Sequence, residues 1–219
     1  IIKSGKLNYT KIGTTITKAE ENYEQGAIAA EEADIAIVFV KAVSGESYLS
    51  VENVSEGDRM DLDLWHGGNE LIEIVAEANP NTIVVINAPC VVSMPWLDKV
   101  RAVIFSGFPG AESGNAISDI LFGVVNPSGH LPYVWAPLEE YNVIINSTMA
   151  EYSEGFYQVN YTEGLYIGQR YFNKENKKPT FPFGFGLSYT KFEYNGLTTL
   201  MSKEGLKVSF YVTNIGQVE

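Results

Sequence analysis

Residues Ile35-Ala36-Ile37-Val38-Phe39-Val40 form an uninterrupted apolar run of strand length that decides the fold class. β-Branched and aromatic side chains dominate it, and such continuous runs are typical of strands that are buried on both faces of a parallel sheet. Thr82–Ala88 repeats the pattern, and Ala102–Ser106 gives a shorter third example. The sequence therefore predicts a mainly parallel sheet built from these three runs.

Helical patterns lie before, between and after the runs. Three segments have the apolar spacing of amphipathic helices: 18–33, His66–Asn79 and Ala111–Phe122. Thr17 and Glu20 form a capping box, and Gly123 suits the left-handed residue that ends a helix. Leu131–Trp135 reads as a short strand, confined by Pro132 to an edge or a strand end. This order of elements predicts the α/β class, with a mainly parallel sheet sandwiched by helices.

The chain changes character after about residue 150. Residues 151–190 are rich in Tyr, Phe and Gly without a regular period, and we expect a packed connecting arm there. Phe192–Tyr194 and Leu206–Val212 alternate like two half-buried strands. Because two strands are not stable alone, we expect them to begin a truncated β-sandwich. The expected division is an α/β domain at 1–150, the arm at 151–190 and an incomplete β domain at 191–219.

Charge and composition exclude several classes of partner. The 27 acidic residues outnumber the 15 Lys and Arg, which gives a net charge of −12. This balance disfavours nucleic acid and anionic membrane surfaces, which are bound by basic patches, and it suits a neutral substrate. No apolar run approaches the roughly 18 residues of a membrane span. One cysteine and two histidines are too few for a Cys- or His-based metal centre, and Cys90, just after an apolar run, is expected to be buried.

The segment from Lys41 to Trp65 is the strongest candidate for a functional loop. It follows a predicted strand, and ligands in open α/β sheets bind beyond the carboxyl ends of strands. Glu46 lies two residues from Tyr48 on a glycine-containing stretch, so the loop could combine proton transfer with an aromatic ring for the substrate. The spacing of Glu46 and Tyr48 alone does not distinguish such a functional loop from an acidic loop that is simply exposed to solvent.

A second glycine-containing turn, Gly107–Gly114, invites comparison with phosphate-binding loops. It matches neither the dinucleotide pattern G-x-G-x-x-G nor a P-loop, which needs Gly-Lys-Ser/Thr. Glu112 would also put a carboxylate at the helix N-terminus, where a phosphate would otherwise bind. A flavodoxin-like nucleotide-binding domain is therefore disfavoured, and the glycines are expected to allow close packing.

Longer motifs make the chain recognisable from about residue 25 to its end. It resembles glycoside hydrolase family 3, in its fungal β-glucosidase branch. The resemblance rests on ADIAIVFV at 33–40, SGESY at 44–48, EGDR at 56–59, LWHGG at 64–68, NPNTIVV at 79–85, GFPGAESGNA at 107–116, NPSGHLPY at 126–133, EGLYIGQRYF at 163–172 and FPFGFGLSYT at 181–190. It implies a three-part enzyme with an N-terminal barrel, an α/β sandwich and a fibronectin-III-like domain. This chain would hold the sandwich, the arm and the first strands of the third domain.

The resemblance also implies site residues. The general acid/base of the family maps onto Glu46, and the tyrosine that lines the leaving-group subsite maps onto Tyr48. Ser47 departs from the family, which usually has glycine there, and nothing in the chain corresponds to the nucleophilic aspartate on the barrel. The implied activity is hydrolysis of terminal β-D-glucosyl residues from cellobiose or aryl glucosides. It needs no metal or cofactor, and this part of the enzyme should be inactive alone.

Other functions stay open at this point. Aromatic residues could make the chain a non-catalytic carbohydrate-binding module, and related family 3 enzymes include β-xylosidases and exo-glucanases. Four glycosylation sequons favour a secreted protein that is extracellular or associated with the cell wall: Asn8, Asn53, Asn146 and Asn160. Glu56, which lies near Asp58 and Arg59, is expected to form a structural ion pair rather than to act as the acid.

Overall fold

A three-stranded parallel sheet lies at the centre of the chain. The computed structural model describes residues 23–44, 59, 61–141, 151–153, 156–158 and 163–218. The sheet order is β1 (Ala36–Lys41), β2 (Thr82–Asn87) and β3 (Ala102–Phe105), with Val38 opposite Val84 and Val84 opposite Val103. All three predicted runs therefore form strands, and the parallel α/β class is confirmed.

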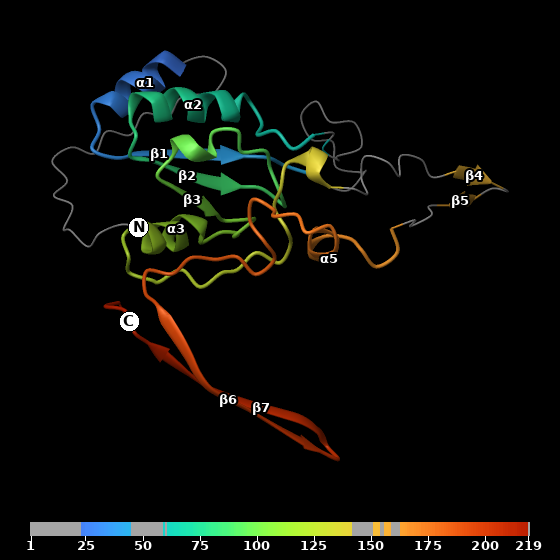
Figure 1. Ribbon diagram of the computed structural model, residues 1–219. Helices are drawn as coiled ribbons and strands as arrows, with labels where there is room; N and C mark the ends of the chain where they lie inside the picture. Colours follow the sequence, from blue (N-terminus) through green and yellow to red (C-terminus); the bar gives the residue numbers. More distant parts are fainter. Residues whose placement is uncertain are drawn as a thin grey trace.

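Three helices accompany the sheet, as the apolar spacing predicts. They are α1 (Tyr23–Glu31), α2 (Gly68–Ala78) and α3 (Ser113–Leu121). Figure 1 shows α1 and α2 together on one side of the strands and α3 beyond β3, away from them. Gly123 follows α3 with a φ of 70°, the left-handed conformation expected at a helix end. The predicted capping box at Thr17 and Glu20 lies outside the described residues.

Burial differs between the strands, and the expectation of two buried faces is correct only for β2. Thr82–Ile86 are all buried because β2 lies between two neighbouring strands. In β1, Ala36, Val38 and Val40 are buried beneath the helices, whereas Ile37 is 42% and Phe39 62% exposed. The expectation fails for β1 because it is an edge strand of the described sheet and helices cover only one of its faces.

The predicted strand at Leu131–Trp135 is not a strand of the sheet. Its only ladder contact among the described residues is an antiparallel bridge between Trp135 and Phe181, closed by backbone bonds of 2.8 and 2.9 Å. The Leu131 N–H also donates to the carbonyl of Phe185 at 2.8 Å. The segment pairs with the arm because Pro132 interrupts the row of donors that a central strand needs.

The arm contains more regular structure than its composition suggests. Its elements are the short hairpin β4 (Glu151–Ser153) and β5 (Phe156–Gln158), and the helix α5 (Gln169–Lys174). Two short 3₁₀ turns, η2 (Leu97–Lys99) and η3 (Leu138–Glu140), precede it in the chain. Phe172 of α5 is fully buried against Val134 and Ala136. The arm is thus anchored on residues of this same chain.

A long hairpin forms the last described part of the chain. β6 (Phe192–Ser202) and β7 (Gly205–Asn214) pair antiparallel and are longer than the two predicted stretches. Every residue of both strands is exposed, so the expected half-buried alternation is wrong for this hairpin. Figure 1 shows that the hairpin extends away from the sheet and helices, which leaves both of its faces uncovered. None of the helices in the described ranges is long and apolar enough to cross a membrane.

Candidate functional site at the carboxyl edge of the sheet

The three strands run parallel, so their carboxyl ends share one edge of the sheet (Figure 1). β1 ends at Lys41, β2 at Asn87 and β3 at Phe105. The loop after β1 is the long one that carries the predicted functional residues. The loop after β2 contains Cys90–Trp96, which provides most of the hydrogen bonds that organise this edge.

The predicted site residues Glu46 and Tyr48 lie outside the described residues, as do Glu56 and Asp58. The structure does describe both ends of their loop. On the outgoing side, the Ala42 N–H donates to the carbonyl of Asn87 at 3.0 Å. On the returning side, the Trp65 N–H donates to the carbonyl of Lys41 at 2.9 Å. The loop therefore leaves and rejoins the sheet at its carboxyl edge, where ligands of open α/β sheets bind.

Arg59 connects the returning side of this loop to the loop after β2. Its Nη2 donates to the carbonyl oxygen of Val91 at 2.9 Å and to Sγ of Cys90 at 3.0 Å. Its Nη1 is buried and has no hydrogen-bond partner in the described part of the chain. The sequence assigns Arg59 to an ion pair with neighbouring carboxylates, and those residues lie outside the described ones. Its contacts with Cys90 and Val91 cannot be predicted from the sequence around Arg59.

Cys90 is exposed, so the prediction that it is a buried apolar residue is wrong. The buried stretch of β2 and its extension ends at Ala88, whose exposure is 0%. Pro89 and Cys90 already belong to the loop beyond the sheet edge. The prediction failed because the buried run ends two residues earlier than assumed, and Cys90 instead accepts the hydrogen bond from Arg59.

A second set of hydrogen bonds fixes the returning side of the loop further along. Ser93 Oγ donates to Asp63 Oδ1 at 2.6 Å, and the Ser93 N–H donates to the carbonyl of Leu62 at 2.7 Å. Asn69 Nδ2 lies 3.2 Å from Asp63 Oδ1 and 3.1 Å from Ser93 Oγ. Asn69 Oδ1 accepts the indole N–H of the fully buried Trp96 at 2.8 Å. Residues 62–69 and 93–96 thus form one connected frame.

Aromatic side chains form the other wall of the loop after β2. Trp135 is 3% exposed and donates from Nε1 to the carbonyl of Val92 at 2.8 Å. Its ring meets the ring of Phe105 edge-on at 5.1 Å and lies 6.3 Å from that of Tyr133. Burial raises the pKa of Tyr133 to about 12, so its phenol keeps its proton at physiological pH. The local sequence pattern predicts these aromatic residues only as parts of strands, because their mutual contacts join distant positions.

The glycine-containing turn after β3 does not form a phosphate site. Glu112 immediately precedes α3, at the helix N-terminus where the sequence predicts a carboxylate. Its Oε2 accepts a hydrogen bond from Asn115 Nδ2 at 2.6 Å. A carboxylate therefore lies at this helix N-terminus, where it would repel a phosphate. Among the described residues, no three His, Cys, Asp or Glu side chains are grouped so that they could hold a metal ion.

The arrangement provides a rigid frame around the two ends of the long loop. A model of the glycosyl hydrolase family 3 C-terminal domain matches residues 3–189. The chain belongs to glycosyl hydrolase family 3.

Relatives in this family are similar over most of the chain. The chain is 42% identical over 197 residues to a probable β-glucosidase L of Aspergillus terreus, a match that covers 87% of this chain and 25% of that protein. Among solved structures, a β-D-glucoside glucohydrolase from Trichoderma reesei has a TM-score of 0.73 at 41% identity, covering 83% of this chain and 25% of the other. The β-glucosidase D2-BGL from Chaetomella raphigera has a TM-score of 0.78 at 36% identity, covering 90% and 29%.

The family 3 resemblance inferred from the sequence motifs is confirmed by these matches. The chain spans about a quarter of the length of the curated relatives that it matches.

Proposed function

We propose that the chain is the part of a retaining β-glucosidase that supplies the general acid/base. The observation that carries this proposal is the 42% sequence identity, over 87% of the chain, to a fungal protein named a probable β-glucosidase. The substrate class is a terminal, non-reducing β-D-glucosyl residue, as in cellobiose or an aryl glucoside. The catalytic residue is Glu46, and Tyr48 lines the subsite of the leaving group.

The chemistry needs two carboxyl groups about 5–5.5 Å apart, one as nucleophile and one as acid. The carboxylic acid of Glu46 donates its proton to the glycosidic oxygen while an aspartate attacks the anomeric carbon and the glycosidic bond breaks. The carboxylate of Glu46 then takes a proton from the water that hydrolyses the glycosyl-enzyme, which restores both groups. The reaction consumes one water and requires no metal or cofactor.

The partner that this mechanism requires is a barrel domain of the same polypeptide, which carries the nucleophilic aspartate. The coverage of only 25% of the relatives leaves room for such a domain. Within the present chain, we assign residues 1–150 to the α/β sandwich, 151–190 to the connecting arm and 191–219 to the start of a fibronectin-III-like domain. The parallel sheet within the first range and the separate β6–β7 hairpin in the last support this assignment.

The decisive experiment compares Glu46→Ala with Glu56→Ala in the full-length enzyme. General acid/base catalysis is worth about 10²–10⁴-fold, and the alkoxide leaving group of cellobiose needs the proton. Glu46→Ala should therefore lose cellobiose cleavage by that factor, while an aryl glucoside with an acidic phenol is still cleaved to the glycosyl-enzyme. Azide should restore turnover of this variant, because it attacks the glycosyl-enzyme without help from a base.

Glu56 provides the matched control, since it is a glutamate of the same loop and also lies beside a glycine. Glu56→Ala should show neither the dependence on the leaving group nor the rescue. The opposite result in the two variants would transfer the acid role to Glu56. Xylobiose cleaved in preference to cellobiose would make the enzyme a β-xylosidase, and sugar binding without any hydrolysis would make the chain part of a carbohydrate-binding module.

The proposed location is outside the cell or at the cell wall, where an enzyme of cellulose degradation meets its substrate. The support is the four sequons at Asn8, Asn53, Asn146 and Asn160, all outside the described residues. N-glycosylation would make the protein a secreted glycoprotein. Treating the protein from its native source with an N-glycosidase should lower its apparent mass in gel electrophoresis, and an unchanged mass together with recovery only from cell lysate would contradict secretion.

A further inference from the structure

We infer that an apolar surface of the arm is the interface with the barrel domain, an assignment that rests on the proposed function because that function supplies the barrel. The surface, called the arm patch, consists of Leu165, Tyr166, Ile167 and Phe183, all of which are exposed. It is a docking surface and contains no residue of the proposed catalytic machinery. Its partner is a folded domain of the same polypeptide, so the contact is intramolecular.

Three residues of the arm patch are consecutive in the sequence. Leu165 is 75% exposed, Tyr166 46% and Ile167 44%. Phe183, which follows α5 in the sequence, is 61% exposed. Single exposed apolar residues are common, but a run of three is unfavourable on a surface that faces only water. Such a run marks a surface that another part of the protein covers.

Hydrogen bonds and packing hold the two parts of the arm patch together. The Phe183 N–H donates at 2.9 Å to Oε1 of Gln169, the first residue of α5 and two positions after the end of the run. Nζ of Lys174 lies 4.1 Å from the ring centroid of Tyr166, which is a cation–π contact. Phe172, which is fully buried, anchors α5 itself. The apolar surface is therefore preformed, and its side chains are exposed on an ordered part of the chain.

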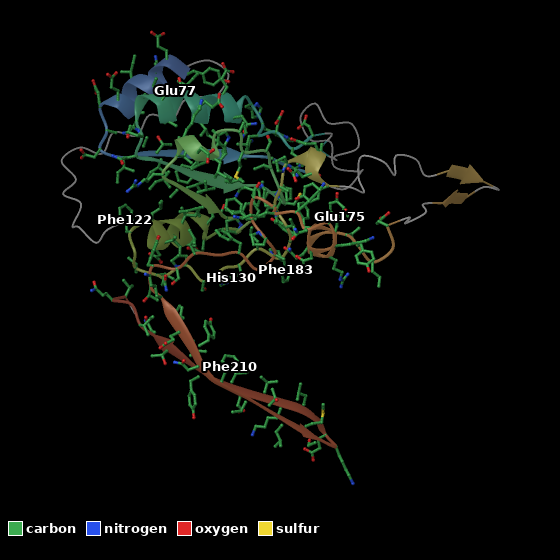
Figure 2. The ribbon with its side chains drawn as sticks, in the orientation of Figure 1. Glu77, Phe122, His130, Glu175, Phe183 and Phe210 are labelled. Carbon is green, nitrogen blue, oxygen red and sulfur yellow. The ribbon has the colours of Figure 1, made fainter. Side chains whose placement is uncertain are left out.

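The arm patch lies beside the carboxyl edge of the sheet. Two residues before Phe183, Phe181 forms the bridge with Trp135, closed by backbone bonds of 2.8 and 2.9 Å. The indole N–H of Trp135 donates to the carbonyl of Val92, in the loop after β2. Figure 1 shows α5 on the side toward which β1 and β2 point, and Figure 2 shows Phe183 on this part of the arm. The patch thus adjoins the edge at which ligands of open α/β sheets bind.

This position selects the barrel domain as the occupant. In the proposed function the barrel carries the nucleophile, and the two carboxyl groups of a retaining glycosidase lie about 5–5.5 Å apart. The barrel must therefore approach the carboxyl edge, because the long loop leaves and rejoins the sheet there. The match covers only 25% of a related probable β-glucosidase L, which leaves room for a domain of that size. A barrel that approaches this edge meets the arm patch beside it.

The rim of the arm patch is basic, although the chain as a whole carries a net charge of −12. Exposed cations lie along α5 and in the residues after it: Arg170, Lys174, Lys177 and Lys178. An apolar centre with a polar rim is the usual anatomy of a protein interface. Charge complementarity requires acidic residues opposite this rim. We therefore expect the facing surface of the barrel to be apolar at its centre and acidic around it.

Hydroxyl-radical footprinting of the full-length protein, read by mass spectrometry, tests whether the arm patch is covered. Ile28 provides the matched control, because it is an isoleucine of α1 that is 52% exposed, close to the 44% of Ile167. Two isoleucines of similar exposure should be oxidised at similar rates. If the barrel covers the arm patch, Ile167 should be oxidised severalfold more slowly than Ile28. Equal oxidation of the two would overturn the inference.

Zero-length cross-linking of lysine amines to carboxylates in the full-length protein identifies the occupant. Lys174 and Lys178 should couple to Asp or Glu residues of the barrel domain in the same molecule. A mixture of isotopically light and heavy protein separates this result from a contact between copies. Cross-links that join light to heavy protein, or that stay within the 219 residues of the present chain, would overturn the assignment of the barrel as occupant.

A substitution in the full-length protein tests whether the apolar contact stabilises the docking. Leu165→Glu should lower the midpoint of thermal unfolding and raise the oxidation rate of Ile167 toward that of Ile28, because it places a charge in the apolar centre. Ile28→Glu, the matched control on α1, should change neither quantity. If Leu165→Glu fails to fold, Arg170→Glu at the exposed rim decides, since it should raise the oxidation of Ile167 while keeping the apolar centre. No change in any folded arm-patch variant would contradict the inference.

Hydrolysis by the same protein separates this inference from the proposed function. If Glu46→Ala shows the expected dependence on the leaving group while Ile167 is oxidised as readily as Ile28, only the interface is wrong. If Ile167 is protected and the lysines couple to the barrel while Glu46→Ala shows no such dependence, the interface is correct and the proposed acid is wrong.

Discussion

The side chain of Asn69 joins the long loop to the buried core. Its Oδ1 accepts the indole N–H of Trp96, which is 0% exposed, at 2.8 Å. Asn69→Leu keeps a similar volume but leaves this buried donor without an acceptor, which costs about 1–3 kcal/mol. We expect the free energy of unfolding of the chain to fall by that amount in urea denaturation.

Asn115 is the control for this substitution, because it is an exposed asparagine whose bond to Glu112 lies at the surface. Asn115→Leu should change the free energy of unfolding by no more than about 0.5 kcal/mol. Equal effects of the two substitutions would show that the Asn69 network contributes no special stability.

Tyr133 predicts a dependence of stability on alkaline pH. Burial raises its pKa in the folded chain to about 12, above the value of about 10 for an unfolded tyrosine. Between these two values the unfolded chain has lost the proton and the folded chain has kept it, so stability falls as pH rises. Below about pH 10 both states are protonated, and the contribution of this group is fully present.

Tyr133→Phe should weaken this alkaline decline, measured as the free energy of unfolding from neutral pH to about pH 11. At neutral pH the substitution should be nearly neutral or stabilising, because the buried hydroxyl has no hydrogen-bond partner in the described part of the chain. A decline that is as steep in the variant as in the parent would refute the assignment. Tyr141 and Tyr189, whose pKa values burial also raises, contribute to the decline that remains.

The sequence indicates which residues belong to the loops, but it does not indicate which residues they contact. Cys90 was expected to be buried because it follows an apolar run, but the buried part of that run ends at Ala88 and Cys90 is exposed. The contact between Arg59 and Val91 joins positions 32 residues apart, and no local period encodes it. Glu46 and Tyr48 came from the family motif, and their placement stays a prediction.

Among the secondary-structure elements, the strands and helices of the sheet were predictable because continuous apolar runs and helical spacing are local properties. The burial of each strand was not predictable, because it depends on how many strands lie beside it in the sheet. β2 has a strand on each side and is buried throughout, whereas β1 has one neighbour and leaves Phe39 62% exposed. The pairing of Leu131–Trp135 with the arm was missed for a similar reason, since its partner lies about 50 residues later.

The end of the arm is held against the α/β part by a close approach at Gly186. A Cβ on Gly186 would overlap the carbonyl oxygen of Gly129 and would lie 3.0 Å from Cδ2 of His130. The nearby side chain of Asn126 accepts the Tyr189 N–H at 2.8 Å and donates to Ser188 Oγ at 2.9 Å. Gly186→Ala should therefore displace the segment from Phe181 to Tyr189.

Limited proteolysis of the chain measures this displacement as a faster cleavage between residues 181 and 190. Gly114 is the control, because it lies in α3 and an added Cβ would meet nothing within 4 Å. Gly114→Ala should slow or leave unchanged the cleavage of the arm, since alanine favours the helix by about 1 kcal/mol. Cleavage of Gly186→Ala at the rate of the parent would show that the segment tolerates the added methyl group.

For the molecule as a whole, the α/β part and the β6–β7 hairpin contrast in how they are stabilised. The α/β part has a buried core that includes Trp96, Ile72 and Ile86. Side chains stand out on both faces of the hairpin (Figure 2), with Phe210 52% and Leu197 71% exposed. A hairpin that buries so little is marginal in water, so the α/β part should dominate cooperative unfolding.

We expect the 219-residue chain to be catalytically inert on its own. Under the proposed function, Glu46 can protonate a leaving group, but the aspartate that forms the glycosyl-enzyme lies outside these residues. An acid without its nucleophile cannot divide the reaction into its two displacement steps. The purified chain should release no nitrophenol from an aryl β-glucoside above the rate without protein, whereas the full-length enzyme at the same molar concentration should do so readily. Two results together would contradict this prediction: activity that co-elutes with the chain in size-exclusion chromatography, and a change in that activity in the Glu46→Ala variant. They would mean that the nucleophile is present in the chain.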